Sequence, residues 1–315
     1  MLILQLIAYP FLCSSVNAQN IQGLHQSVWA WEVKGKNRSI FLLGEMHNFS
    51  SDFKTKKIDH SLGLKIASLS EEIWMEPRQA RDDLLQPRML LKDRISPEIW
   101  RRLDKSVKES IDFLSALSSD RRAHLHHDFM EETNRRDPIG AHINIEFLTN
   151  LKFKKKFPSK YLTYPGFGDY LNANLPKILP GKSVPIEDES AMSRSWRNSC
   201  SKTDADALID ASLKSLSDDN TQLANKLSTL FLSANGDLDE LIKIYLSDAA
   251  GPIFFKCSIT PRNYAWLPKV LTALEGTGAP VVFLVGIAHL WGEDGLISLL
   301  KKNGYADIKR IHDVK

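Results

Sequence analysis

Two histidines that follow similar apolar segments are the residues best suited to chemistry in this chain. An apolar segment at 41–43 leads into Gly44-Glu45-Met46-His47, and another at 283–285 leads into Gly286-Ile287-Ala288-His289. A glycine at the end of a strand permits a sharp turn, which would bring the histidine back over the sheet edge. In open α/β sheets, ligands bind beyond the carboxyl ends of the strands. The two histidines therefore meet at one site if their strands are neighbours.

Two carboxylates follow other short segments of strand-like sequence. Glu76 ends the segment 73–75, and Glu187 ends the segment 184–186. Two histidines and a carboxylate are sufficient to hold a divalent ion and leave a position open for water. Such an ion lowers the pKa of its bound water toward neutrality and so supplies a nucleophile. The sequence leaves open the alternative that either glutamate has only a structural role, as a helix-cap partner or an edge charge.

The periodicity of apolar residues predicts the elements that must position these side chains. Strands are expected at 28–33, 39–43, 72–76, 182–187, 280–285 and 306–311. Helices are expected at 57–69, 169–178, 203–217, 219–234, 237–247, 263–274 and 293–303, with one beginning at Ser96-Pro97. Residues 80–150 are polar with helical periodicity, and the lysine-rich segment from residue 151 is expected to break the helical structure. We therefore predict an α/β fold, a mixed central sheet flanked by helices, with a helical insertion at about 80–160 between the two parts of the core.

Composition excludes several classes of protein. The chain has 315 residues, of which 43% are hydrophobic and 25% are charged, as in ordinary globular proteins and unlike disordered or collagen-like chains. A formal net charge of +3 is too small to indicate a nucleic-acid partner. The sequence has no P-loop, G-x-G-x-x-G, G-x-S-x-G or H-E-x-x-H motif, which argues against nucleotide binding, serine hydrolysis and ordinary zincin chemistry.

The N-terminal segment predicts export from the cytoplasm. Residues 1–12 are strongly apolar, and Val16-Asn17-Ala18 has the form of a signal-peptidase site, so residues 1–18 are expected to be a signal peptide. The mature protein would be a single domain, 19–315, secreted or periplasmic and without a stable membrane span; an uncleaved anchor is the alternative. Cys200 and Cys257 would remain in an oxidising compartment, but their spacing cannot show whether they pair.

Two further clusters are more simply explained as solvated surface. His124-Leu125-His126-His127-Asp128 is the densest histidine cluster, but it lies in a polar helical stretch and lacks the last ligand of a binuclear site. The basic segment 152–157 could touch an anionic lipid or polysaccharide, but a solvated loop is the simpler explanation. Neither cluster is assigned to the site.

The residues around the second histidine resemble a known family. Residues 262–268 read Arg-Asn-Tyr-Ala-Trp-Leu-Pro, and residues 286–296 read Gly-Ile-Ala-His-Leu-Trp-Gly-Glu-Asp-Gly-Leu. With the spaced Gly-x-x-His pair, these segments resemble the TraB/GumN family, which includes the Tiki-type metalloproteases and the pheromone-shutdown proteins. The resemblance is strongest over 234–311, good over 28–76 and loose over 80–200.

The resemblance implies an α/β core and, by analogy with the Tiki-type members, proteolysis that depends on a divalent metal. His47 and His289 match the two histidines of the family, and Glu76 matches its acidic strand end. Arg262 and Asn263 match its Arg-Asn pair. An arginine at this position could hold a substrate carboxylate or stabilise a developing oxyanion.

Glu45 departs from the family pattern. Many members have threonine after the first glycine, whereas Gly-Glu-x-His is similar to the haem-binding lipoproteins of the ChaN type. Glu45 could be an additional ligand or the general base. The departure keeps two alternatives open, a haem- or metal-binding protein without turnover and a non-catalytic interaction protein.

The sequence as a whole predicts a metal-dependent hydrolase that acts on a peptide or protein substrate. Its cofactor would be Mn, Co or Zn, with haem as the alternative. The predicted metal ligands are His47, Glu76 and His289, and the predicted catalytic residues are Glu45, Glu187, Arg262 and Asn263.

Overall fold

The fold was examined in a computed structural model of the chain. The residues that the structure describes are 25–46, 48–51, 58–76, 90–114, 118–156, 162–178, 182–188, 195, 199–217, 226–227, 230–231 and 236–312. The predicted signal peptide, His47 and most of the helix expected at 219–234 lie outside these residues. None of the helices in the described ranges is long and apolar enough to cross a membrane.

A mixed sheet of six strands forms the centre of the molecule, as the sequence predicts. In spatial order the strands are β10 (Ile308–Ile311), β2 (Val28–Lys34), β3 (Ser39–Glu45), β9 (Val281–Gly286), β6 (Glu72–Met75) and β8 (Ser183–Pro185). β10, β2 and β3 pair antiparallel, while β3, β9, β6 and β8 run parallel. The carboxyl ends of these four parallel strands therefore meet at one edge of the sheet.

Two small sheets flank this edge. β1 (His25–Gln26) pairs parallel with β5 (Ile58–Asp59), and β4 (Asn48–Ser51) pairs antiparallel with β7 (Leu162–Pro165). The second pair joins the segment that follows β3 to the segment that precedes the helix α6. It therefore brings residues near the first Gly-x-x-His motif into contact with a distant part of the chain.

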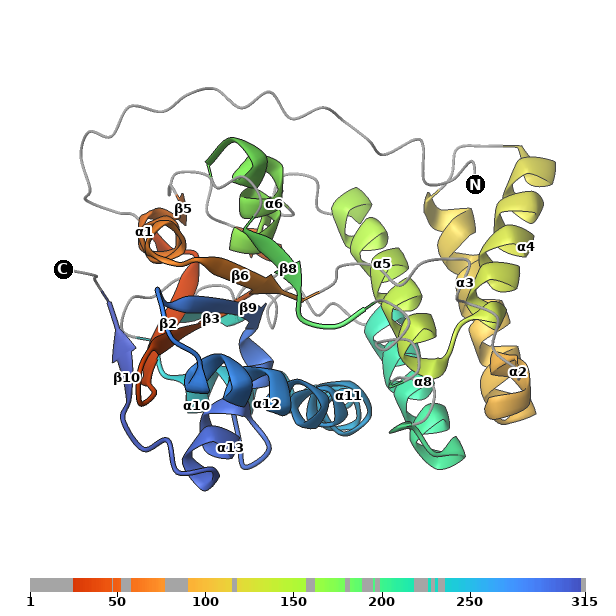
Figure 1. Cartoon of the computed structure of the whole chain (residues 1–315). Coiled ribbons are helices and arrows are strands. Elements are labelled where there is room, and N and C mark those ends of the chain that lie inside the picture. Colours follow the sequence, from red (N-terminus) through yellow and green to blue (C-terminus); the bar gives the residue numbers. More distant parts are fainter. Residues whose placement is uncertain are drawn as a thin grey trace.

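Helices cover both faces of the central sheet (Figure 1). One face packs against α1 (Ser61–Leu69) and α6 (Phe167–Ile178), and the other against α10 (Leu238–Leu246), α12 (Thr260–Glu275) and α13 (Leu296–Lys302). Alternation along β3 explains this, because Phe41 and Leu43 belong to the first cluster while Ile40 and Leu42 belong to the second. The predicted α/β fold is thus confirmed.

A separate helical layer lies beside the sheet and is visible at the right of Figure 1. It contains α2 (Leu91–Arg94), α3 (Pro97–Leu114), α4 (Ser119–Arg135), α5 (Pro138–Lys156) and α8 (Lys202–Ser217). One apolar cluster joins these helices, so α8 packs with the predicted insertion although it lies beyond residue 160.

The helix break expected from residue 151 begins later than predicted, because α5 continues to Lys156 and the strand β7 follows at 162–165. Lys152 Nζ donates a hydrogen bond to the carbonyl of Leu216, 2.8 Å away, and Lys155 Nζ donates to the carbonyl of Phe113 at 2.6 Å. Both carbonyls are near the C-terminal ends of helices, where carbonyl groups lack helical partners and cations are favoured. At least these two lysines therefore have a structural role.

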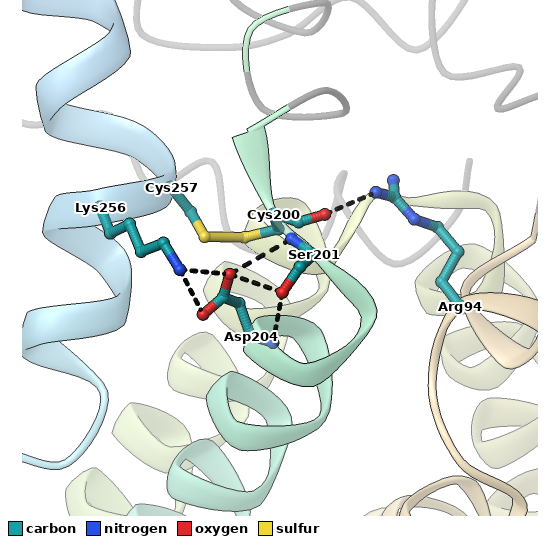
Figure 2. A network of polar contacts seen from close by, with 6 residues as sticks. All are labelled: Arg94, Cys200, Ser201, Asp204, Lys256 and Cys257. Carbon is teal, nitrogen blue, oxygen red and sulfur yellow. Dashed lines mark hydrogen bonds and ion pairs between the residues drawn. A yellow bond between two sulfur atoms is a disulfide. The ribbon is translucent and has the colours of Figure 1, made fainter.

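A disulfide joins the helical layer to the core. Cys200, which precedes α8, is bonded to Cys257 in the π-helix η3 (Phe255–Ile259), which lies between α11 (Gly251–Phe254) and α12. Figure 2 shows the ion pair between Lys256 and Asp204 beside it, at 2.7 Å. The disulfide that the sequence left open is therefore present, and its Cys257 lies five residues before Arg262 along the chain.

Candidate functional site

The two strands that carry the Gly-x-x-His motifs are neighbours in the sheet. β3 and β9 pair in parallel, and their register places Glu45 opposite Gly286. A shared site requires that the two strands be neighbours, and β3 and β9 are neighbours. His47 lies outside the described residues, whereas His289 lies in η4 (Ile287–Leu290) and is 1% exposed.

Close packing, not a left-handed turn, explains the first glycine of these motifs. Neither Gly44 nor Gly286 has a positive φ angle. A Cβ atom at Gly44 would lie 2.3 Å from Cδ1 and 3.3 Å from Cα of Ile287, so a side chain here would displace Ile287 and crowd the start of η4. The expected sharp turn is thus replaced by a close contact between the two motifs.

Arg262 holds two of the predicted carboxylates together. Its Nη1 donates to Oε1 of Glu76 at 2.6 Å, and its Nε donates to Oε1 of Glu187 at 2.7 Å. Arg262 is 2% exposed and Glu187 is 6% exposed, so this pairing is shielded from water. Because buried charges are stable only when paired, the three side chains form one unit.

Asn263 fixes the orientation of His289. The Nδ2 group of Asn263 donates to the carbonyls of His289 and Asp294, at 3.1 and 2.8 Å. Its Oδ1 must then accept a hydrogen bond from Nδ1 of His289, 2.6 Å away. With the proton on Nδ1, the lone pair of a neutral His289 is on Nε2, which lies 3.6 Å from Oε1 of Glu76.

Trp266 and the start of η4 complete the packing around this pair. The Trp266 ring lies 4.3 Å from the His289 ring, and the guanidinium of Arg262 lies 4.6 Å from the Trp266 ring. The main-chain N–H of Gly286 donates to Oε2 of Glu76 at 3.0 Å. Both oxygens of Glu76 are therefore positioned by the protein.

Glu45 lies at the same edge but projects to the other face of the sheet. Its Oε2 accepts a short hydrogen bond from the main-chain N–H of Gly168, in the first turn of α6. Its neighbour His60 is stacked on Tyr170, and burial lowers the pKa of His60 to about 4, although the charges of Asp59 and Glu45 oppose this. The structure thus brings together Glu76, Glu187, Arg262, Asn263 and His289, and places Glu45 apart from them.

Trp266 and the main-chain donor of Gly286 also belong to the site, although neither was predicted from the sequence. Trp266 was part of the segment that carried the family resemblance, and it lies four residues after Arg262, a spacing that places both on one face of a helix. That spacing was the available signal. A main-chain donor has no signature in the side-chain pattern, so sequence reasoning could not identify it.

Two of the three clustered histidines of α4 are solvated, as expected, while His126 is partly buried and its Nε2 lies 3.1 Å from Oδ1 of Asp104 on α3. The side chains of His124 and His127 are 77% and 74% exposed and lie near Asp128 and Glu131 on their own helix. Within the described ranges, no group of three or more His, Cys, Asp or Glu side chains is arranged to hold a metal ion. The candidate site therefore offers His289 and Glu76 as two donors, and any further donor would have to come from outside these ranges.

Comparison with known proteins supports the resemblance in one part of the chain. No curated protein and no solved structure matches the chain significantly. The model of the TraB/PrgY/gumN family matches residues 190–307, which include Arg262, Asn263 and His289. The matched model is that of the family which the sequence resembles, and the match covers residues 190–307 of the 315.

Proposed function

We propose that the protein is a metal-dependent hydrolase that cleaves a peptide bond. The observation that carries the proposal is the pair formed by Nε2 of His289 and Oε1 of Glu76, 3.6 Å apart in a buried network. A neutral imidazole nitrogen and a carboxylate oxygen both carry lone pairs of the kind that a divalent cation binds, and here they lie close together. The family match includes the histidine of this pair.

The donor set fits a divalent ion in its chemistry. Imidazole and carboxylate suit Zn, Mn and Co, and Asn263 supplies the second contact that usually fixes the tautomer of a metal-binding histidine. We propose His289 and Glu76 as two ligands and His47 as the third. A bound ion would lower the pKa of a coordinated water and polarise the scissile carbonyl.

Glu187 is the side chain best placed to accept a proton from water. Its Oε1 accepts a hydrogen bond from Nε of Arg262, while its Oε2 takes part in no hydrogen bond among the described residues. Glu45 is less suited, because its carboxylate is bound at the N-terminus of α6 on the opposite face. We therefore assign the general base to Glu187 and give Arg262 the role of positioning the two carboxylates.

Peptide cleavage measured by mass spectrometry tests this proposal. The purified protein would be incubated with a mixed peptide library, with added Mn, Co or Zn and with a chelator. We expect cleavage that the chelator abolishes, and a loss of about 100-fold or more in Glu187→Gln with metal content retained. Glu275→Gln, an exposed carboxylate near the other end of α12, is the control. The proposal fails if no metal supports cleavage, or if Glu187→Gln cleaves as fast as the wild type.

Haem binding without turnover is the second candidate, and the Gly-Glu-x-His form of residues 44–47 favours it. Addition of haem to the metal-free protein distinguishes the two. A Soret band that is lost in His47→Ala would support haem binding, and an unchanged spectrum would exclude it.

We propose a secreted or periplasmic location for the mature protein. The disulfide between Cys200 and Cys257 supports it, because structural disulfides persist mainly in oxidising compartments. Mass spectrometry of the protein expressed in its native host tests this. A mature chain that begins at Gln19 is expected, and an intact N-terminus on a cytosolic protein would contradict the location.

A further inference from the structure

A pocket opens on the surface beside Asn263. It lies between η3, the start of α12 and the turn that follows η4, and its lining includes Phe255, Trp291, Glu293 and Asp294. Gly292 adopts a positive φ of 84° in this turn, with nothing near its missing Cβ, and so lets the chain reverse at the rim of the pocket. None of these features was used in the proposed reaction.

Two aromatic side chains, Phe255 and Trp291, form part of the pocket wall. Phe255 packs edge to face against Trp291, with ring centroids 5.8 Å apart, and Tyr245 also packs edge to face against Phe255. The indole N–H of Trp291 donates to Oδ1 of Asp239 at 2.6 Å, which fixes the orientation of the Trp291 ring. The faces of aromatic rings carry partial negative charge and attract cations.

The side chains of Glu293 and Asp294 place negative charge at the pocket, and no cation among the described residues pairs with them. Asp239 accepts a hydrogen bond from the indole N–H of Trp291, and Asp294 accepts one from the hydroxyl of Tyr264 at 2.7 Å. Neither carboxylate forms an ion pair among the described residues. The Glu293 side chain is exposed and likewise has no ion pair there. Lys302 donates to the main-chain oxygen of Glu293, not to its carboxylate. Aromatic walls and carboxylates together favour a cation over any anionic group.

Asn263 connects the pocket to the proposed reaction site. It lines the pocket, and its Nδ2 group donates to the carbonyls of Asp294 and His289. Its Oδ1 accepts a hydrogen bond from Nδ1 of His289. A side chain bound in the pocket would therefore contact Asn263, which in turn contacts His289. We propose that the pocket is a subsite for a cationic side chain, arginine or lysine, of the peptide substrate. That this side chain belongs to a substrate rests on the proposed hydrolase function, whereas the binding of the cation itself does not.

Direct binding separates this inference from the question of turnover. Isothermal titration of the full-length protein would compare capped arginine (Nα-acetyl-arginine amide) with capped citrulline, which has nearly the same shape without the charge. We expect arginine to bind about tenfold more tightly than citrulline, and the difference to shrink in high salt. Because the assay requires no catalysis, its result stands whether or not a peptide is cleaved.

The variants for this test keep the shape of the pocket. Glu293→Gln combined with Asp294→Asn removes two charges and retains an acceptor for Tyr264, so the loss of the preference for arginine is expected without unfolding. Trp291→Leu should also weaken arginine binding, while Glu275→Gln should leave it unchanged. The inference is overturned if arginine and citrulline bind equally, if neither binds, or if the double variant binds arginine as the wild type does.

Discussion

Arg262 lies between Glu76 and Glu187, and all three side chains are largely removed from water. A buried arginine that serves two carboxylates is bound firmly and has little freedom to move toward a substrate. The same guanidinium bridges the two carboxylates and offsets their negative charges. At the residue scale the site is therefore built on charge balance.

Arg262→Met tests this balance. The substitution leaves two buried carboxylates without their cation, so we expect the free energy of unfolding to fall by about 3–5 kcal/mol. Urea denaturation measures the change. Arg262→Met combined with Glu76→Gln and Glu187→Gln should recover most of the loss, because no uncompensated charge remains. A triple variant as unstable as the single variant would contradict the account.

The residues of the site could be named from the sequence, but not their grouping. His289, Glu76 and Glu187 were predicted because each follows a strand-like segment, whereas Arg262 and Asn263 were predicted from the family resemblance. The pattern could not show that Glu45 projects to the opposite face, because this depends on the register of β3 and on the contact with Gly168. Alternation along a strand assigns a face only once the partners on each face are known.

At the scale of elements, the disulfide ties α8 to the segment that leads into α12 (Figure 2). The bridged cysteines are 57 residues apart in sequence. Removing the bridge with Cys200→Ser and Cys257→Ala should lower the free energy of unfolding by about 2–4 kcal/mol, because the unfolded chain loses a constraint. Thermal or urea unfolding measures the change. Lys256→Ala, which removes only the neighbouring exposed ion pair, should cost less than about 1 kcal/mol. Equal effects of the two changes would show that the bridge contributes no stability.

The junction between α5 and the loop after α10 predicts a pH dependence. Burial, together with the charge of Asp248, raises the pKa of Glu146 from 4.5 to about 7. Since the pKa is higher in the folded state, this group favours folding at low pH, and that contribution is lost as the pH rises toward 7.

Glu146→Gln should therefore be more stable than the wild type at pH 8, by an amount on the order of 2 kcal/mol, and equally stable at pH 4. Urea unfolding at the two pH values measures the difference. Glu275→Gln, an exposed change, is the control and should show no such dependence. A Glu146→Gln effect that is the same at both pH values would contradict the raised pKa.

The elements themselves were largely predictable. The strands and the flanking helices follow period-2 and period-3.6 patterns, and Gly304 ends α13 with a φ of 90°, as a C-cap glycine should. The lysine-rich end of α5 was misinterpreted because the carbonyls that its lysines bind belong to distant helices. A tertiary contact of this kind leaves no trace in the local sequence.

At the scale of the whole molecule, the parallel strands β3, β9, β6 and β8 present their carboxyl ends at one edge, and the candidate site lies there. This placement agrees with the general rule for ligand sites in open α/β sheets. The helical layer is linked to the same region through the disulfide (Figure 2), so the site lies near the junction of both parts of the fold.

We propose that this edge of the sheet holds a divalent ion, and elemental analysis after loading with Mn, Co or Zn measures its occupancy. We expect about one equivalent of metal in the wild type and in Glu275→Gln, and almost none in His289→Ala or His47→Ala. Asn263→Ala should bind metal about 10–100-fold more weakly, because His289 loses the contact that fixes its tautomer. Equal and near-zero metal in the wild type and in every variant would contradict the account.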